Sequence, residues 1–250
     1  MLMQIRKINP HKIAKYFSYL CLIVFCMFAV LASIRIYNTW KVTHLNKELK
    51  ELKAEIDDKR WDNGLIDLNE DYIGWITIYG TTVDAPVVQS KDNNDYLRKD
   101  FNGNYSIAGT LFMDYMVDGY SETDNRIIYG HMMRDNTMFG SLKKYKSLNF
   151  FKENNIVYYK DCFGEHYYKL FAALTVAASS TDTEYLNIQE WAKHLDKEGT
   201  ETMLGTLKDR AYIFQDDIRG ENQYIFLVTC DLSRGETGTR LILVGEEMEK

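Results

Sequence analysis

Cys230 is the first candidate for chemistry in this sequence because of where it lies. It follows the apolar run Tyr-Ile-Phe-Leu-Val-Thr, which has the composition of a buried β-strand, and polar residues begin directly after it. A residue at the end of such a strand is held by packing and is open to solvent on one side, as a nucleophile requires. Cys162 lies in a polar turn, and a structural disulfide between Cys162 and Cys230 is the alternative to a reactive thiol.

A cysteine nucleophile needs a partner that takes its proton and later protonates the leaving group, and histidine is the usual one. His131 follows the apolar run Ile-Ile-Tyr-Gly, so it also lies at a strand end. The other histidines beyond the N-terminal apolar segment are His44, His166 and His194. Its position makes His131 a candidate partner of Cys230, and an ordinary surface histidine is the alternative.

Arg240 is the third candidate. It opens the apolar run Leu-Ile-Leu-Val-Gly, which the chain reaches from Cys230 through Gly235 and Gly238. If these two strands pair, the guanidinium returns to the same rim as the thiol, where it could bind a substrate carbonyl or stabilise an oxyanion. The alternative is a charge at a strand end that only faces solvent.

The elements that must position these residues are mostly short strands. Eight stretches rich in Ile, Val, Tyr and Thr are separated by Gly, Asn and Asp turns. They are Ile73–Tyr79, Thr82–Val88, Gly109–Met113, Arg126–Tyr129, Ile156–Tyr159, Tyr167–Ala173, Tyr224–Thr229 and Arg240–Val244. Helical spacing of apolar residues predicts a helix within Thr183–Asp209. The expected fold class is mainly β, an eight-stranded closed β-barrel with N-terminal helices and a helix inserted between two late strands, because closure leaves no exposed edge.

The N-terminal residues carry the clearest compositional signal. Tyr16–Ile34 is a run of 19 residues without a charge, and a helix of that length spans about 28 Å, close to the thickness of a bilayer core. Residues 1–37 contain five basic residues and no acid, so they carry a charge of +5. Because the net charge of the chain is −6, the remaining residues carry −11. This asymmetry predicts a single-pass cell-membrane anchor with the N-terminus inside and the body extracytoplasmic. A cleaved signal peptide is the alternative, although its apolar core is usually shorter.

An amphipathic stretch follows the apolar run. Its apolar residues are spaced three and four apart on one helical stripe, namely Val42, Leu45, Leu49, Leu52 and Ile56. We expect a helix packed on the following domain that ends before Asn63-Gly64, with a short coiled-coil dimer as the alternative. The predicted organisation is a cytoplasmic segment and transmembrane anchor at 1–37, a juxtamembrane helical region at 38–70 and a catalytic domain at 71–250.

Several classes of protein and site are disfavoured. The net charge of −6 argues against nucleic acid as a partner. Acids are numerous between residues 92 and 124, but they have no EF-hand spacing, so we interpret them as solvated loops and expect no metal and no cofactor. These acids are Asp92, Asp95, Asp114, Asp118, Glu122 and Asp124.

Two long blocks of the sequence resemble the sortases, and within them class B. The first block is Tyr96-Leu97, Phe101, Gly103, Ser106, Gly109-Thr110-Leu111-Phe112, Asp114, Asn125 to His131, Met138 to Leu142 and Tyr145. The second is Leu227-Val228-Thr229-Cys230-Asp231 with Arg240 after it. The resemblance covers about residues 73–245 and keeps the order His, Cys, Arg.

This resemblance implies a membrane-anchored cysteine transpeptidase on a sortase barrel. Cys230 would attack the carbonyl of a threonine in a C-terminal sorting signal of a secreted surface protein. His131 would protonate the departing amine, and Arg240 would steady the substrate and the oxyanion. The thioacyl enzyme would be resolved by an amine of a peptidoglycan precursor or cross-bridge.

The resemblance also implies a peptide groove. Its expected lining residues are Asn93, Leu97, Thr181, Tyr185, Leu186 and Thr229. Val228 departs from the class, in which serine is frequent at this position, so a side-chain hydrogen bond to substrate is in doubt there. A hydrolytic cysteine endopeptidase with the same residues and a non-enzymatic, membrane-anchored β-barrel binding domain are the alternative functions.

Overall fold

The computed structural model describes residues 10–55, 62, 64–220, 222–230 and 238–249. The chain divides into two compact units, Met1–Lys41 and Val42–Lys250. The second unit contains the sheet and the candidate site.

Helix α1 (Pro10–Glu55) is continuous, so the expected N-terminal helices form one helix of 46 residues. Its apolar side chains from Tyr16 to Ile34 are exposed. Within the described ranges, this helix is the one that is long and apolar enough to cross a membrane. The end expected before Asn63-Gly64 falls beyond Glu55, and residues 56–61 and 63 lie outside the described residues.

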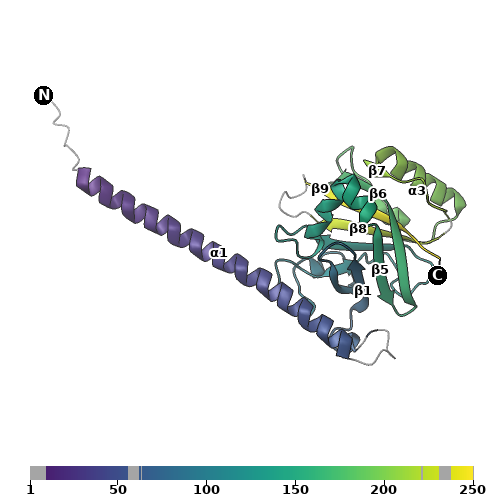
Figure 1. Ribbon diagram of the computed structural model, residues 1–250, viewed down its shortest axis with the longest axis horizontal. Helices are drawn as coiled ribbons and strands as arrows, with labels where there is room; N and C mark the ends of the chain where they lie inside the picture. The colour runs from purple at the N-terminus through teal and green to yellow at the C-terminus, as the bar shows by residue number, and fades with distance from the viewer. Residues whose placement is uncertain (1–9, 56–61, 63, 221, 231–237, 250) are drawn as a thin grey trace. The chain divides into compact units, whose positions relative to one another are not determined.

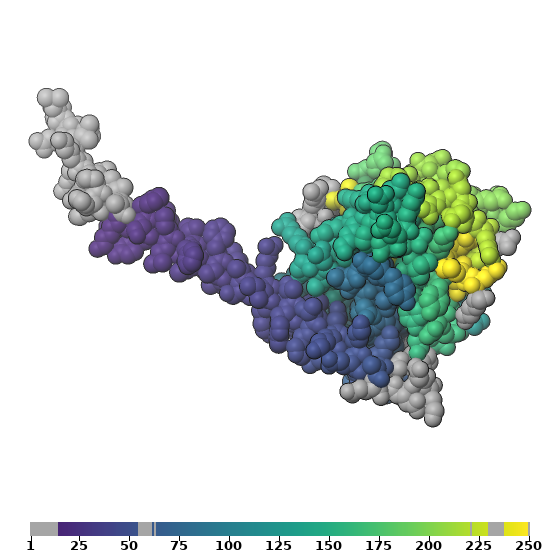
Figure 2. Space-filling model, viewed as in Figure 1, coloured from purple at the N-terminus to yellow at the C-terminus, as the bar shows by residue number. Residues whose placement is uncertain are grey.

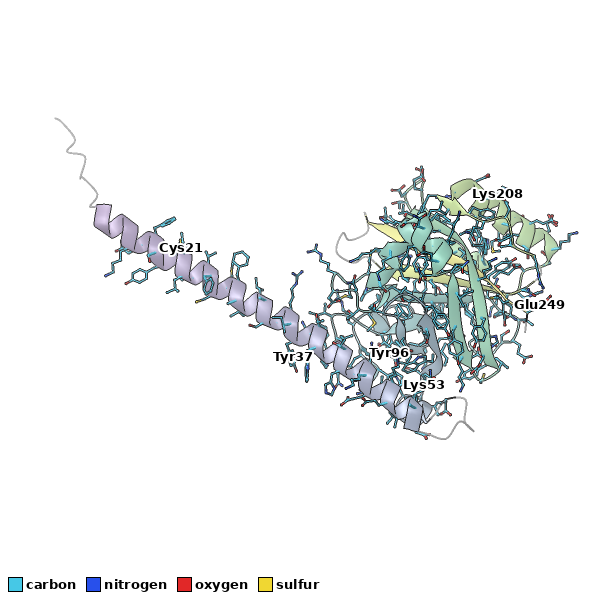
Figure 3. All side chains as sticks on the ribbon, in the orientation of Figure 1. Cys21, Tyr37, Lys53, Tyr96, Lys208 and Glu249 are labelled. Atoms are coloured by element: carbon cyan, nitrogen blue, oxygen red, sulfur yellow. The ribbon has the colours of Figure 1, made fainter. Side chains whose placement is uncertain are left out.

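The part of α1 that belongs to the second unit packs on the barrel. Val42 and Leu49 are buried in the main hydrophobic core, and Leu45 and Leu52 pack against it. The ammonium of Lys53, labelled in Figure 3, lies 4.4 Å from the ring centroid of Trp75. The amphipathic stripe therefore packs on the following domain, as predicted.

All eight expected strands are present. The strands are β1 (Tyr72–Ile78), β2 (Asp84–Val88), β3 (Leu111–Met113), β4 (Arg126–His131), β5 (Ile156–Asp161), β6 (Gly164–Ala177), β7 (Ile213–Phe214), β8 (Tyr224–Cys230) and β9 (Thr239–Glu247). β7 was not expected, because two residues carry no periodic signal. β6 is twice as long as expected and is the longest strand of the described chain.

Eight of these strands close into a barrel. Their order is β5-β1-β2-β3-β4-β8-β9-β6, and β6 also pairs with β5, which completes the ring. β7 pairs antiparallel with Ala172 and Ala173 of β6 (Figure 1). The predicted eight-stranded closed barrel is therefore confirmed, with β4 and β8 joined as parallel neighbours although they are far apart in sequence. Figure 2 shows yellow C-terminal residues at the surface of the molecule.

Short helices fill the connections. They are η1 (Leu65–Asp67), η2 (Asp95–Leu97), η3 (Phe139–Lys146), α2 (Leu148–Glu153), η4 (Ile188–Trp191) and α3 (Lys197–Arg210). The helix predicted within Thr183–Asp209 is present between β6 and β7, but it is two helices, η4 and α3. Asp196 caps the second one by accepting a hydrogen bond from the Gly199 N–H at 2.8 Å. In the last turn of α3, Lys208, which is labelled in Figure 3, forms an ion pair with Asp216.

A buried charged cluster joins four strands at the start of β4. The Arg126 guanidinium donates to Asp161 at 2.8 Å, and both side chains are almost fully buried. The His166 ring lies between two carboxylates, 3.1 Å from Asp161 and 2.7 Å from Glu247. Burial alone would lower the pKa of His166, but these two hydrogen bonds and charges raise it to about 9. The cluster therefore links β4, β5, β6 and β9 through opposite charges.

Candidate active site

The pairing of β4 with β8 brings His131 and Cys230 together. The two strands run parallel, with Arg126 opposite Ile225 at one end and His131 opposite Cys230 at the other. Both residues are the last of their strands. The two residues that sequence analysis selected from distant positions are therefore direct neighbours in the sheet.

Arg240 lies on the other side of β8. β8 and β9 pair antiparallel up to Val228 opposite Ile242. The contact continues one residue further, where the Leu241 N–H donates to Thr229 Oγ1 at 2.9 Å. If this register is extended by one more residue, from Thr229 and Leu241, Cys230 lies beside Arg240. His131, Cys230 and Arg240 thus fall in one row across three neighbouring strands.

His131 is held by the chain that precedes β3. The side chain is only 7% exposed, and its Nε2 lies 2.8 Å from the carbonyl oxygen of Leu97. Because a carbonyl oxygen only accepts, Nε2 is the donor, which selects the Nε2–H form of the neutral ring. The Leu97 carbonyl was not a predicted contact, since a main-chain acceptor leaves no mark in the sequence.

The other histidines lie in different surroundings. His44 is in α1, 3.2 Å from Glu48 one helical turn away. His166 belongs to the buried charged cluster, at the opposite end of the strands from Cys230. His194 is exposed, and its main-chain N–H donates to Asp124. The register therefore selects His131 among the four candidates.

Cys162 is a free thiol in the turn between β5 and β6. The alternative of a disulfide between Cys162 and Cys230 is therefore contradicted. Burial raises the pKa of the Cys162 thiol, and the charge of Asp161 acts in the same direction. A thiol of this kind is a weak nucleophile at neutral pH.

Two segments outside the barrel carry five of the six residues predicted to bind peptide. Asn93 and Leu97 lie before and within η2, and both are half-buried. Thr181 is exposed, whereas Tyr185 and Leu186 are half-buried. Tyr185 forms a bridge with Ala177 at the end of β6, next to Val176, which pairs with Arg240. The second segment therefore begins beside the β9 end of the row formed by His131, Cys230 and Arg240.

Thr229 is different, because its side chain is fully buried. Its hydroxyl also donates a hydrogen bond to the Leu241 carbonyl at 3.3 Å, so the donor of this hydroxyl already has a partner within the sheet. Contact of this side chain with a peptide would require that hydrogen bond to break. Val228, the departure from the class pattern, is fully buried as well.

Two of the acids expected in solvated loops are in fact buried. Asp114 is 0% exposed and Asp124 is 7% exposed, whereas Asp92, Asp118 and Glu122 are exposed as expected. Asp114 directly follows β3, and Asp124 directly precedes Asn125 and β4. The prediction was wrong for these two because each carboxylate has several hydrogen-bond donors around it, which replace the lost water.

Asp124 and Asn125 fasten the segment after η4 to the barrel. Asp124 accepts hydrogen bonds from the Lys193 ammonium at 2.8 Å and from the His194 N–H at 3.3 Å. Burial raises the pKa of Asp124, but the hydrogen bond from Lys193 and the other donors outweigh it and lower the value. The Asn125 amide donates to the Trp191 carbonyl at 2.8 Å. This inserted segment is therefore fixed on the barrel by several bonds.

The chain is similar in sequence to known proteins. Residues 76–248 match the family model described as the sortase domain. The chain is 30% identical to sortase B of Staphylococcus aureus over 186 residues, which cover 72% of this chain and 71% of that protein. It is 31% identical to sortase B of Listeria monocytogenes over 200 residues, which cover 80% of this chain and 78% of that protein.

Solved structures are similar as well. Sortase B from B. anthracis in complex with AAEK1 has a TM-score of 0.74 and 25% identity, and the match covers 86% of this chain and all of that one. A sortase B–substrate complex from Staphylococcus aureus has a TM-score of 0.70 and 26% identity, and the match covers 83% of this chain and 94% of that one.

Proposed function

Since the chain belongs to the sortase family, as a cysteine transpeptidase of the sortase B type, we propose that it cleaves a C-terminal sorting signal after threonine. It then joins the new carboxyl end to an amine of the cell wall. The substrates are secreted surface proteins, and the acceptor is a peptidoglycan precursor or cross-bridge amine.

The pairing of His131 with Cys230 is the observation that carries this proposal. A thiol and an imidazole at neighbouring positions can exchange a proton, which acyl transfer through cysteine requires. Arg240, in the same row, brings a fixed positive charge to the place where an oxyanion forms. The three residues have the roles of nucleophile, general acid–base and oxyanion stabiliser.

The first half-reaction forms a thioester. The Cys230 sulfur, as thiolate, attacks the threonine carbonyl carbon, and the carbonyl oxygen becomes an oxyanion beside Arg240. The intermediate collapses as the C–N bond breaks, and protonated His131 gives its proton to the leaving amine. Because the Nε2 proton is held by the Leu97 carbonyl, we assign this transfer to Nδ1.

The second half-reaction releases the product. The acceptor amine attacks the thioester carbon and gives a proton to neutral His131. The C–S bond breaks, the Cys230 thiolate leaves, and a new amide bond remains. An amine held in position reacts ahead of water because its attack is in effect intramolecular.

The groove residues follow from the same proposal. Asn93, Leu97, Thr181, Tyr185 and Leu186 lie on the two segments that flank the row. Thr229 directly precedes Cys230 on β8, and its side chain is buried. We assign the peptide to the space between these segments. The Staphylococcus aureus relative has been solved as a substrate complex, which supports a peptide site in proteins of this fold.

The apolar part of α1 has the role of a membrane anchor in this proposal. Its exposed apolar side chains and the basic residues before it suit a single span with the N-terminus inside the cell. Residues 1–37 then form the cytoplasmic segment and anchor, 38–70 the juxtamembrane helical region, and 71–250 the extracytoplasmic catalytic domain.

The test is a cleavage screen with the full chain in detergent micelles. Short peptides that vary around a central threonine are incubated with the protein, and the acyl-enzyme is trapped and located by mass spectrometry. We expect a thioester on Cys230 that ends in threonine, and an amide product once an amine such as triglycine is added. If saturating amine gives only hydrolysed peptide, the protein is an endopeptidase. If no acyl-enzyme forms with any peptide, a binding domain is the remaining function.

A further inference from the structure

We propose that Asp114 is a positioning residue for the peptide groove, which it shapes by holding Asn93, Tyr129 and Gln189 on one buried carboxylate. This inference deepens the proposed function and rests on it. Asp114 touches neither the nucleophile nor the general acid in the described contacts, so its effect falls on peptide binding.

The carboxylate is the meeting point of three segments. Its Oδ2 atom accepts hydrogen bonds from Asn93 Nδ2 at 3.0 Å, Tyr129 OH at 2.8 Å and Gln189 Nε2 at 2.7 Å. Its Oδ1 atom accepts one from the Met116 N–H at 2.8 Å. Asn93 precedes η2, Tyr129 is in β4, and Gln189 is in η4. The side chain is 0% exposed, so these donors replace the water that an ionised carboxylate would otherwise bind.

One of these donors fixes a predicted groove residue in a single orientation. Asn93 donates through Nδ2 to Asp114, and its Oδ1 accepts a hydrogen bond from the Tyr115 N–H at 3.1 Å. The two bonds distinguish the nitrogen from the oxygen of this amide. The amide remains half-buried, and it keeps a second N–H and a second lone pair for a peptide.

The other two donors, Gln189 and Tyr129, connect the segment of Leu186, which is one wall of the groove, to strand β4. The segment of Asn93 is the opposite wall. Gln189 belongs to η4, which follows directly on the segment of Tyr185 and Leu186. Tyr129 lies two residues before His131 on the same strand, and therefore on the same face of the sheet. Through Asp114, the segment of Asn93 and the segment of Leu186 are tied to each other and to the strand of the catalytic histidine. The width of the groove is thereby set before a peptide arrives.

The sequence offers a matched control. Asp124 is also a buried carboxylate that holds the inserted segment, through Lys193 and His194. It has no contact with Asn93 or Tyr129 among the described hydrogen bonds. Asp114→Asn and Asp124→Asn therefore make the same chemical change at two buried carboxylates. Only the carboxylate of Asp114 is bonded to both segments that flank the groove.

Binding is measured by protection of Cys230 from iodoacetamide in the full chain in detergent micelles, with the threonine peptide that the cleavage screen selects. In Asp114→Asn, we expect the half-protecting concentration to rise at least about tenfold, because hydrogen bonds to a charged group are lost at both walls. The alkylation rate without peptide should stay within about twofold. In Asp124→Asn the half-protecting concentration should change less than about threefold. Gln189→Met, which removes one partly exposed donor, should lie between the two.

Hydrogen exchange supplies a readout that needs no peptide. In Asp114→Asn, amides of residues 93–97 and 186–191 should exchange faster, whereas Asp124→Asn should affect residues 193–196 and leave 93–97 unchanged. Unchanged exchange in Asp114→Asn, equal peptide effects of the two variants, or a fall in the alkylation rate of Asp114→Asn without peptide would overturn the positioning role. If no peptide protects the unsubstituted protein, the proposed function fails, and the exchange pattern still decides the role of Asp114.

Discussion

Replacement of His166 by glutamine should remove a pH-dependent part of the stability of the barrel. The imidazole lies between Asp161 and Glu247 and is 9% exposed. Although burial opposes its charge, the two carboxylates raise its pKa from the ordinary 6.5 to about 9. A raised pKa means that the folded state binds the proton more tightly than the unfolded state. The stabilisation is therefore complete below about pH 6.5 and is lost as the pH rises through about 9.

The magnitude follows from the shift. One unit of pKa difference corresponds to about 1.36 kcal/mol. The interval between 6.5 and about 9 therefore gives about 3 kcal/mol of stabilisation by the protonated His166. This is a large fraction of the stability of a typical domain, which is about 5–15 kcal/mol.

The assay is urea unfolding of the full chain in detergent micelles, followed by the fluorescence of the buried Trp75 and Trp191. The free energies of unfolding of the unsubstituted protein and of His166→Gln are compared at about pH 6 and about pH 10. We expect their difference to shrink by about 3 kcal/mol between the two pH values. The comparison is needed because burial lowers the pKa of Lys53 to about 8, which makes stability rise with pH and opposes His166. Since both proteins contain Lys53, its contribution cancels in the difference.

A difference in free energy that is the same at both pH values would refute the reasoning. It would mean that His166 is neutral in the folded state and contributes only ordinary hydrogen bonds. A difference that grows with pH would reverse the sign of the linkage and would contradict the assignment of both carboxylates as its partners.

Four further predictions concern the site and the scaffold. Cys230→Ala should abolish peptide turnover and leave the Tm within about 2 °C in a thermal scan, since alanine fills most of the same space; residual turnover would reassign the nucleophile. His131→Ala and Arg240→Ala should each lower kcat/KM at least about 100-fold in the peptide assay, and normal rates in either variant would remove its role. Gly130→Ala should destabilise the fold by about 1–3 kcal/mol in urea, because the new Cβ would lie 2.4 Å from Leu111 and 2.8 Å from Phe139; an unchanged midpoint would mean that these side chains move aside freely. Gly205→Ala in α3, where the new Cβ meets no atom within 4 Å, should instead stabilise by up to about 1 kcal/mol, and a destabilised variant would contradict the exposed helical position.

The strands were predictable because their pattern is local. Each of the eight expected runs became a strand, since branched and aromatic residues between turn residues specify extended chain without distant partners. β7 has only two residues, and its pairing with Ala172 and Ala173 depends on the rest of the sheet. The helical insertion was predicted as one element, although Asp196, a typical N-cap, marked the start of α3 within it.

The members of the row could be selected from the sequence as candidates, but their geometry could not. Strand ends at His131 and Cys230 can be identified from composition, but the parallel pairing of β4 with β8 depends on the closure of the whole barrel. The buried acids were missed because a carboxylate is usually exposed. A signal for Asp114 exists, since it is a single acid within the run Leu-Phe-Met-Asp-Tyr-Met-Val. The donors from Asn93 and Gln189 come from distant segments, which no local pattern reveals.

The side-by-side arrangement of β4 and β8 also controls when the enzyme can react. His131 and Cys230 are separated by 99 positions along the chain, and contacts of such long range form late and slowly during folding. Until they form, the sulfur has no proton acceptor beside it and behaves as an unassisted thiol. Under the proposed mechanism, an unfolded chain therefore lacks the reactive pair, and closure of the barrel is itself the step that switches on catalysis.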